Sequence, residues 1–328
     1  MLKVGIIGGS FGVIGLLPAF ASIKNCKVVA LSSRHGKQLV GFHSYADWRT
    51  MIEKENLDAI ALAVPPKTQY EIVKVAIKKG LHVFAEKPFT ANLAQAKELY
   101  ALAKKNKIVH GIDFEFPEIA EWKKTKELLD RKTFGTLKHV SVDWDWQSGD
   151  TRYGRRSWKT SIREGGGALS AVFSHGIYYL EHFAGKITDV KSAFTFSPLS
   201  LNGGEVGVDM LLKFKGGVTG NVHVSCHSPG FVRHRLLFIC ERGVIVLENK
   251  NAIVDGFTIR TFDKNGEKIL RVSKDTGRKN EDERVKVVKK LAKRFVKACI
   301  AKKQTAPSFA DGVRVQELIE TIRRKSRH

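Results

Sequence analysis

An uncharged stretch at residues 4–23 restricts the folds open to this chain more than any other segment. It holds five glycines and Pro18, and a second apolar run follows almost at once at residues 28–31. A membrane span or an export signal would also be apolar, but neither is interrupted in this way. A buried strand, a glycine turn and a helix explain the pattern better. We therefore expect a cytoplasmic protein that opens with a strand–turn–helix unit.

The first 112 residues alternate between strand and helix patterns. Short apolar runs occur at 3–7, 27–32, 59–64, 82–85 and 108–112. Helical patterns at 70–79 and 93–105 separate some of them, and Gly80 and Asn92 supply a C-cap and an N-cap. Strands that are apolar throughout are buried on both faces, as in a parallel sheet. The pattern predicts an α/β domain with a Rossmann-type, doubly wound parallel sheet.

From about residue 116 the pattern changes to strands with one buried face. Apolar and polar residues alternate over 139–146, and two strands at 206–214 and 218–226 flank Gly216-Gly217 as a hairpin. Further strands are expected at 234–240 and 244–247, with helices at 118–131 and after the glycines at 165–167. We predict a dinucleotide-binding domain at 1–115 and an α+β domain with an open, mostly antiparallel sheet at 116–328.

The charge and the cysteines narrow the possible partners. The net charge is +23, and residues 284–303 carry nine Lys or Arg and no acid on an apolar helical pattern. Such a helix can bind nucleic acid, or it can simply be solvated on one face. No nucleic-acid motif accompanies it, so we favour the solvated face and expect no specific nucleic acid. The four cysteines lie apart and should be reduced, and no metal-ligand spacing occurs, so we expect no metal.

A glycine cluster follows the first predicted strand, where the backbone can approach a pyrophosphate. Glycines at 8, 12 and 15 enclose Ser10 and Phe11, and the next helix offers free N–H groups to an anion. We expect Gly8, Ser10, Phe11 and Gly12 to bind a dinucleotide. The alternative is a glycine turn that binds nothing.

The end of the second predicted strand bears on the choice of dinucleotide. An acid here would hold the ribose hydroxyls of NAD, but this chain has Ser33 and Arg34. Arginine can grip a 2′-phosphate, and serine can donate a hydrogen bond to it. We therefore expect NADP rather than NAD, unless Arg34 is only a solvated loop residue.

Two other strand ends carry candidate residues. In a doubly wound sheet ligands bind at the carboxyl ends of the strands, where Pro65 and the tripeptide Glu86-Lys87-Pro88 lie. Lys87 can stabilise charge on a substrate oxygen during hydride transfer. By position alone, a loop lysine is more often solvated.

A histidine in the second domain is the candidate proton carrier. His175 lies on an apolar helical stretch after the glycines at 165–167, and Tyr178 is one helical turn further on. Histidine exchanges protons near neutral pH. Alone, such a histidine is more often structural.

Taken together, these motifs resemble the glucose–fructose oxidoreductase / inositol dehydrogenase / rhizopine-catabolism (Gfo/Idh/MocA) family over nearly the whole chain. The matching pieces are Leu17-Pro18-Ala19, Asp58-Ala59-Ile60, Pro65, Gly80-Leu81-His82-Val83, Glu86-Lys87-Pro88, Trp158-Lys159, the residues at 165–169, His175 and Phe309-Ala310-Asp311-Gly312.

The resemblance implies an NAD(P)-dependent dehydrogenase or ketoreductase that acts on the CH–OH group of a sugar, a cyclitol or a nucleotide-linked sugar. It also implies a homo-oligomer packed through the second domain's open sheet. Lys87 becomes the lysine that contacts substrate and nicotinamide ribose, and His175 the acid/base. Trp158 and Lys159 are assigned to substrate binding.

The sequence departs from the family pattern mainly at the substrate end. Ala171 replaces a usual aspartate, Tyr178 a second one, Phe173 a glycine, and Gln69 a histidine. Either Tyr178 assists an unusual substrate, or catalysis is lost and the protein senses NADP(H) for a partner. We favour the enzyme, because a sensor needs neither Lys87 nor His175.

Overall fold

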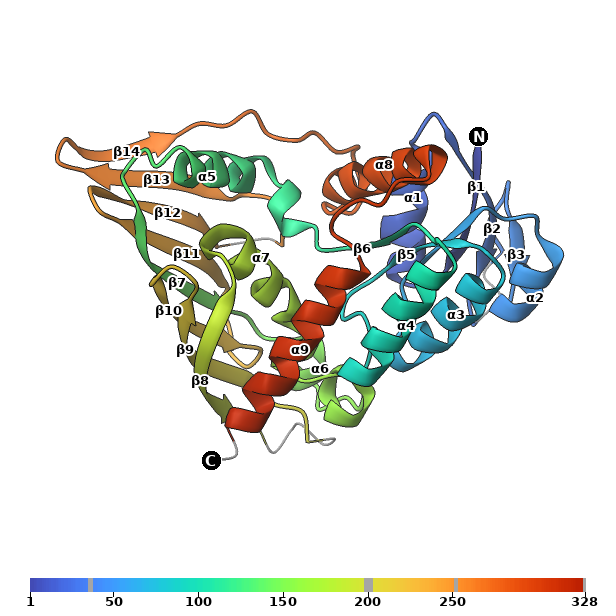
Figure 1. Ribbon diagram of the computed structural model, residues 1–328, viewed down its shortest axis with the longest axis horizontal. Helices are drawn as coiled ribbons and strands as arrows, with labels where there is room; N and C mark the ends of the chain where they lie inside the picture. Colours follow the sequence, from blue (N-terminus) through green and yellow to red (C-terminus); the bar gives the residue numbers. More distant parts are fainter. Residues whose placement is uncertain (35–37, 198–202, 251–252, 327–328) are drawn as a thin grey trace. The chain divides into compact units, whose positions relative to one another are not determined.

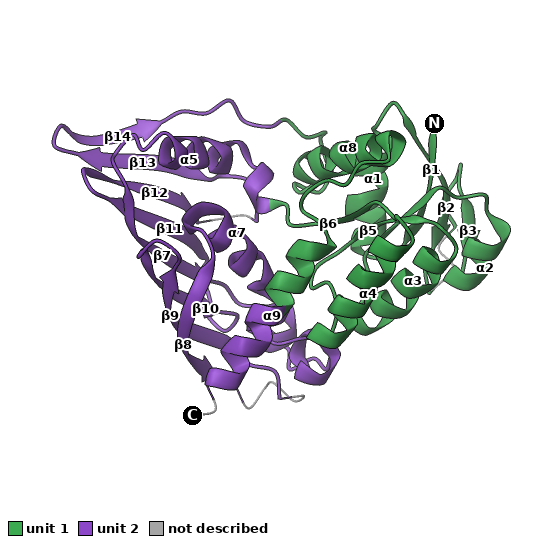
Figure 2. Cartoon of the chain, in the orientation of Figure 1, with its two compact units in different colours: residues 1–115, 276–316 green, residues 116–275, 317–328 purple. Residues whose placement is uncertain are grey.

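The computed structural model describes residues 1–34, 38–197, 203–250 and 253–326, and it divides into two compact units (Figure 2). Unit 1 comprises Met1–Glu115 and Thr276–Gln316, and unit 2 comprises Phe116–Asp275 and Glu317–His328. The sequence suggested one division after residue 115. The chain instead returns to unit 1, because a late helix completes the core of that unit.

The sheet of unit 1 has six parallel strands (Figure 1). In sheet order they are β3 (His43–Tyr45), β2 (Cys26–Ser32), β1 (Leu2–Ile7), β4 (Ala59–Leu62), β5 (His82–Ala85) and β6 (His110–Ile112). The strand order reverses between β1 and β4, and doubly wound sheets bind ligands in the crevice beyond the carboxyl ends at such a reversal. The predicted doubly wound sheet is confirmed. The short strand β3 was not predicted.

Helices cover both faces of this sheet. One face carries α1 (Leu17–Ala21) and α8 (Val285–Ala301), and the other carries α2 (Trp48–Lys54), α3 (Pro66–Lys78) and α4 (Leu93–Lys105). The apolar side of α8 is buried, and Phe295 packs edge-on against Phe84 with ring centroids 5.6 Å apart. Lys289, Lys293 and Lys297 are exposed. The basic helix is therefore amphipathic, with its apolar side in the core.

The starts of two helices can be compared with the sequence pattern. Helix α3 begins at Pro66, four residues before the predicted start, because proline suits the first turn of a helix. At α4 the Asn92 side chain accepts from the Gln95 backbone N–H at 3.0 Å. The Gln95 side chain accepts from the Ala91 N–H at 3.3 Å. The predicted N-cap at Asn92 is therefore confirmed.

The sheet of unit 2 has eight strands. In sheet order they are β14 (Gly266–Leu270), β13 (Thr258–Asp263), β12 (Gly243–Asn249), β11 (Arg233–Cys240), β7 (Leu137–Asp145), β10 (Thr219–Ser225), β9 (Gly207–Phe214) and β8 (Ile187–Thr195). Among the described strands of this sheet, only the β7–β10 pair is parallel. The expected open, mostly antiparallel sheet and the β9–β10 hairpin are confirmed. Strand β7 inserts between β10 and β11, which the sequence did not indicate.

Helices lie on one face of this sheet. They are α5 (Ala120–Asp130), α7 (Ser174–Ala184) and the end of α9 (Phe309–Lys325), and they bury an aromatic core that includes Trp122, Tyr179 and His234. Short segments complete the unit: η2 (Phe116–Glu118), α6 (Gly149–Arg152), η3 (Trp158–Thr160), η4 (Ile162–Glu164) and η5 (Ala168–Val172). On the opposite face Leu211 is 63% exposed.

Two sequence expectations concern the whole chain. Among the described residues, no helix combines the length and the apolar character needed to cross a bilayer. All four cysteines, Cys26, Cys226, Cys240 and Cys299, are buried and free of disulfides.

Candidate functional site

The glycine turn after β1 packs against two neighbouring strand ends. Gly8 has a φ of 133°, and a Cβ there would lie 2.3 Å from the carbonyl oxygen of Ala63, just after β4. A Cβ on Gly9 would lie 3.2 Å from the Ser33 side chain, just after β2. At Gly8 only glycine fits, whereas a Cβ at Gly9 would make a tight contact. The turn thus presents bare backbone at the crevice of the sheet.

The helix after this turn starts directly at the crevice. The carbonyl of Ser10 accepts from Val13 and Ile14 at 2.9 and 3.1 Å, and a π-type turn, η1 (Gly12–Leu16), leads into α1. The ring of Phe11 lies so close to Gly15 that a Cβ there would be 2.2 Å from it. The helix N-terminus carries partial positive charge and N–H donors, which suit a pyrophosphate.

An arginine from the returning segment of unit 1 also reaches this turn. The Arg284 guanidinium lies 4.0 Å from the ring centroid of Phe11. Asp282 holds it with two contacts of 2.8 Å, to Nε and to Nη2. No local pattern predicts this contact, because Phe11 and Arg284 lie more than 270 positions apart in the chain.

The predicted determinants of the dinucleotide lie beside the turn. Ser33 is buried at the end of β2 and its N–H donates to the Tyr45 carbonyl at 3.0 Å, whereas Arg34 is exposed. The neighbouring His35, part of the same motif, lies outside the described residues. The glycine turn and Ser33 are therefore brought together, with a solvent-facing arginine next to them.

The loop that bears Lys87 is held by a glutamine. Gln69 is fully buried near the start of α3, which begins after Pro65, and its amide NH₂ faces three carbonyl oxygens of the loop. The distances are 2.6 Å to Glu86, 3.0 Å to Phe89 and 3.2 Å to Pro88. Gln69 stands where the family pattern has a histidine, and here it anchors the loop of Lys87.

A group of carboxyls that sequence reasoning missed adjoins Lys87. Asp113 and Glu115 follow β6, are 0% and 6% exposed, and lie near Glu86 at the end of β5. Burial and the neighbouring carboxylates raise the pKa of Asp113 well above its usual range. Burial and the charge of Glu86 raise the pKa of Glu115 to about 7. The available signal was their place directly after a strand of a doubly wound sheet.

The candidate proton carrier lies in unit 2. His175 is 4% exposed on α7, and its ring packs edge-on against Phe116 with centroids 5.0 Å apart. Tyr178 is half-buried one turn further along the same helix. The structure thus places the two residues on one helix of unit 2, and Lys87 on a loop of unit 1.

The triple glycine before α7 packs against the chain itself. A Cβ on Gly166 would lie 2.0 Å from the Trp158 carbonyl oxygen, and one on Gly167, whose φ is 87°, would lie 2.3 Å from the Glu205 carboxyl. Glu205 accepts from the Leu169 N–H at 3.2 Å and from Arg323 at 2.6 Å. This buried ion pair fixes the approach to α7, with the segment of Trp158 and Lys159 beside it.

The departures near His175 have a packing explanation. Phe173 is fully buried against Gly176, where a Cβ would lie 2.1 Å from its ring. Ala171 is also buried, on η5. A carboxylate at position 171 would be buried and would need a partner. The local packing therefore accommodates the loss of the aspartate.

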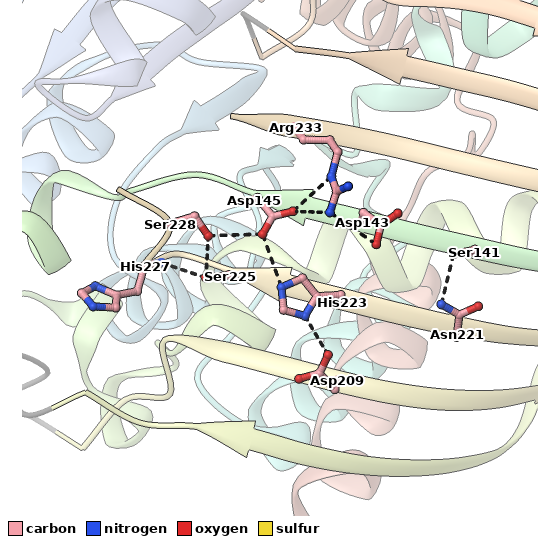
Figure 3. Close-up of polar contacts among 10 residues, drawn as sticks. All are labelled: Ser141, Asp143, Asp145, Asp209, Asn221, His223, Ser225, His227, Ser228 and Arg233. Atoms are coloured by element: carbon pink, nitrogen blue, oxygen red, sulfur yellow. Dashed lines mark hydrogen bonds and ion pairs between the residues drawn. The ribbon is translucent and has the colours of Figure 1, made fainter. Parts of the chain in front are cut away.

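The open face of the unit 2 sheet carries a polar network (Figure 3). Asp145 accepts from Arg233 at 3.0 Å and from Ser228 at 3.2 Å, and the Nε2 of His223 lies 3.3 Å from it. The Nδ1 of His223 lies 2.7 Å from Asp209. Partial burial lowers the pKa of His223, but the contact with Asp209 and the surrounding carboxylates outweigh it and raise that pKa.

Three findings relate the chain to known proteins. Residues 2–114 match the model of an oxidoreductase family with the NAD-binding Rossmann fold (GFO_IDH_MocA), and residues 122–246 match the GFO/IDH/MocA C-terminal domain. An uncharacterized oxidoreductase of Synechocystis sp. is 28% identical over 278 residues, which are 79% of this chain and 75% of the relative.

Two solved structures show the same fold. Levoglucosan dehydrogenase in complex with NADH and levoglucosan superposes with a TM-score of 0.85, at 20% identity over 99% of this chain and 97% of the other. A 3-ketoreductase from Actinomadura kijaniata in complex with NADP and TDP-benzene gives 0.82, at 19% identity over 99% and 97%.

Proposed function

Because the chain belongs to the Gfo/Idh/MocA oxidoreductase family, we propose that it transfers hydride between NADP and a secondary alcohol, or its ketone, on a sugar, a cyclitol or a nucleotide-linked sugar. The observation that carries this proposal is the cradle of Gly8 and Gly9 in contact with the ends of β2 and β4. The nicotinamide would accept or supply the hydride.

The cradle fits a dinucleotide on its own geometry. A side chain at Gly8 would collide with backbone, and the helix N-terminus at Gly12 lies at the same strand ends. Gly8, Ser10, Phe11 and Gly12 would hold the pyrophosphate, with Pro65 and Glu86 beside the nicotinamide half. The 2′-phosphate would meet Ser33 and the exposed Arg34, which supports NADP over NAD.

The chain's own groups divide the chemistry between them. The Lys87 ammonium would stabilise negative charge on the substrate oxygen, on a loop that Gln69 keeps in place. His175 would take the hydroxyl proton during oxidation and return it during reduction, with Tyr178 assisting one helical turn away. Trp158 and Lys159 would bind the substrate. The dehydrogenases and reductases among the relatives favour this enzyme over a non-catalytic sensor.

The open face of the unit 2 sheet is the surface that we propose for self-association. Leu211 is 63% exposed on β9, and acidic and basic side chains are interspersed around it on β7, β10 and β11. An exposed apolar residue within a polar network is typical of oligomer interfaces. We expect Leu211→Glu to give monomers in light scattering, while Lys24→Glu, an exposed change in unit 1, leaves the oligomer intact. Monomers in the wild type would contradict this.

A direct test of the function needs no known substrate at first. Fluorescence titration should show binding of NADPH, and keto-sugars and polyols can then be screened for a change in NADPH absorbance. Binding followed by turnover of a member of these classes supports the proposal. Absence of dinucleotide binding would refute it. Tight NADPH binding without turnover of any substrate in the screen would favour the alternative function, a non-catalytic sensor of NADP(H).

A further inference from the structure

The carboxyl cluster of unit 1, Glu86, Asp113 and Glu115, has the construction of a group that shares protons. The Asp113 N–H donates to the Ala85 carbonyl at 2.9 Å, which brings its carboxyl alongside that of Glu86, within hydrogen-bonding reach. In the described part of the chain, neither oxygen of Asp113 has a well-aligned donor. Asp113 is fully buried and Glu86 is half-buried beside it, so the two carboxylates do not ionise together, and a shared proton supplies the missing donor.

Glu115 extends the cluster toward Lys87. It lies two residues after Asp113, is 6% exposed, and interacts with the charges of both Glu86 and Lys87. Because the side chain is withdrawn from water, each neighbouring charge acts on it with little screening. With a pKa near 7, Glu115 exchanges its proton at neutral pH, whereas Asp113 keeps its own.

The cations around the cluster connect it to the glycine turn. Lys87 faces it from the end of β5, and Arg284 faces it from the segment before α8, where Asp282 holds the guanidinium. Both positive charges lower the proton affinity of Glu115. Arg284 is also the residue that lies over Phe11 at the start of the first helix. One guanidinium thus faces both the carboxyl cluster and the phosphate side of the crevice.

We propose that binding of a dinucleotide at the glycine turn drives proton uptake by the carboxyl cluster, with Arg284 as the coupling residue and Glu115 as the group that takes the proton. This rests on the proposed function, because it needs the pyrophosphate at the turn. The anion offsets the positive charge of Arg284, so a carboxylate of the cluster accepts a proton from water and becomes a neutral acid. No electron moves in this step.

Calorimetry can count the protons. NADPH is titrated into wild-type protein at pH 7 in buffers with different ionisation enthalpies, and the dependence of the observed heat on that enthalpy gives the protons taken up. We expect uptake in the wild type that is absent in Glu115→Gln and reduced in Arg284→Gln. The affinity of the wild-type protein for NADPH should fall with rising pH by at most about tenfold per pH unit, which is the limit for uptake of one proton.

Three controls distinguish proton uptake by the carboxyl cluster from proton uptake by other groups. NADH lacks the 2′-phosphate, which titrates near pH 6, so uptake must persist with NADH. His175→Ala must retain uptake, which excludes the histidine of unit 2. Glu55→Gln removes a carboxylate elsewhere in unit 1, next to His43, and must retain it as well.

Each result of these titrations supports or contradicts the coupling between dinucleotide binding and proton uptake. Equal proton uptake in wild type and Glu115→Gln, or no uptake in the wild type, overturns the coupling while NADPH binding keeps the proposed function intact. Failure to bind either dinucleotide overturns both. Should Glu115→Gln not fold, infrared difference spectra of the wild type with and without NADPH replace it. A new band of protonated carboxyl on binding supports the coupling, and its absence refutes it.

Discussion

The glycine turn after β1 in unit 1 and the triple glycine before α7 in unit 2 use the same residue type for opposite purposes. In unit 1, Gly8 and Gly9 press backbone against strand ends and leave bare backbone facing a crevice. In unit 2, Gly167 admits the carboxylate of Glu205, which Arg323 pairs. In the proposed function the first turn would offer its backbone to a ligand, whereas the second lies against groups of the protein itself. Glycine clusters therefore indicate close approach, and only the surroundings tell what approaches.

The largest effect should come from the two candidate catalytic residues, one in each unit. Lys87→Met in unit 1 and His175→Ala in unit 2 should each lower turnover by about 10²–10⁴-fold, the range for a lost electrostatic or acid/base group. NADP affinity should stay within about tenfold of wild type. Steady-state rates and NADPH titrations on a substrate found by screening measure both.

A control on the same helix is His182→Ala, which changes an exposed histidine of α7 and should leave turnover unaltered. Full activity of His175→Ala would make Tyr178 the next candidate for the proton carrier.

Alanine in each turn tests the contrast itself. Gly167→Ala would displace the Glu205 carboxylate from Arg323 and should lower the free energy of unfolding by about 3–5 kcal/mol, as for a broken buried pair. Gly8→Ala places Cβ against a backbone oxygen at positive φ and should cost about 1–3 kcal/mol.

The two variants should differ in binding. Gly8→Ala should lose affinity for NADPH, whereas folded Gly167→Ala should keep it. Gly149→Ala, where nothing lies within 4 Å of the added Cβ, is the neutral control for stability in urea unfolding. Equal loss of NADPH affinity in both variants would contradict the assignment of separate roles.

A smaller effect is expected at the end of β2. Arg34→Ala should weaken NADP binding by about 1–3 kcal/mol, the scale of a charge-assisted contact to phosphate, and leave NAD binding unchanged. Lys24→Ala removes an equal charge from an exposed position near the start of β2. Calorimetry that shows the wild type preferring NAD, or Arg34→Ala losing both dinucleotides alike, would refute the NADP assignment.

The smallest expected effect is on stability and comes from the open face of the unit 2 sheet, where His223 contacts Asp209. Asp209 and the neighbouring carboxylates raise the pKa of His223, so the charged histidine stabilises the fold below pH 6.5. This stabilisation is lost as the pH rises through the folded pKa. The side chain is 42% exposed, so the gain is about 0.5 kcal/mol or less.

Urea unfolding at pH 5.5 and pH 8.5 measures this contribution. The difference between the two pH values should be smaller in His223→Gln than in the wild type. An equal difference in both proteins would show that the pair with Asp209 contributes nothing.

The sequence was sufficient for the elements that have strong periodicity or clear caps. Strand β5 and helix α4 were predicted to the residue, because an apolar run and Asn92 mark them. The strand β3 escaped prediction, because its three residues are only partly buried and carry no pattern. The place of β7 depends on pairing with strands more than 70 residues away, which no local pattern encodes.

The candidate site divides in the same way. Lys87 and His175 were found from motifs that are contiguous in the chain. The contacts of Arg284 with Phe11, and of Gln69 with the carbonyls after β5, join distant segments and emerge only from the fold. The raised pKa of Asp113 depends mainly on its burial. Aspartate is seldom fully buried, so residue type alone does not predict this position in the core.

The return of α8 to unit 1 has a consequence for synthesis of the chain on the ribosome. Phe295 completes an aromatic cluster with Phe20 and Phe84, at centroid distances of 6.2 and 5.6 Å. Those two rings are translated more than 200 residues before their partner. The part of the first sheet that α8 covers therefore stays exposed until nearly all of unit 2 has emerged, and transiently exposed apolar surface of this kind favours aggregation and chaperone binding.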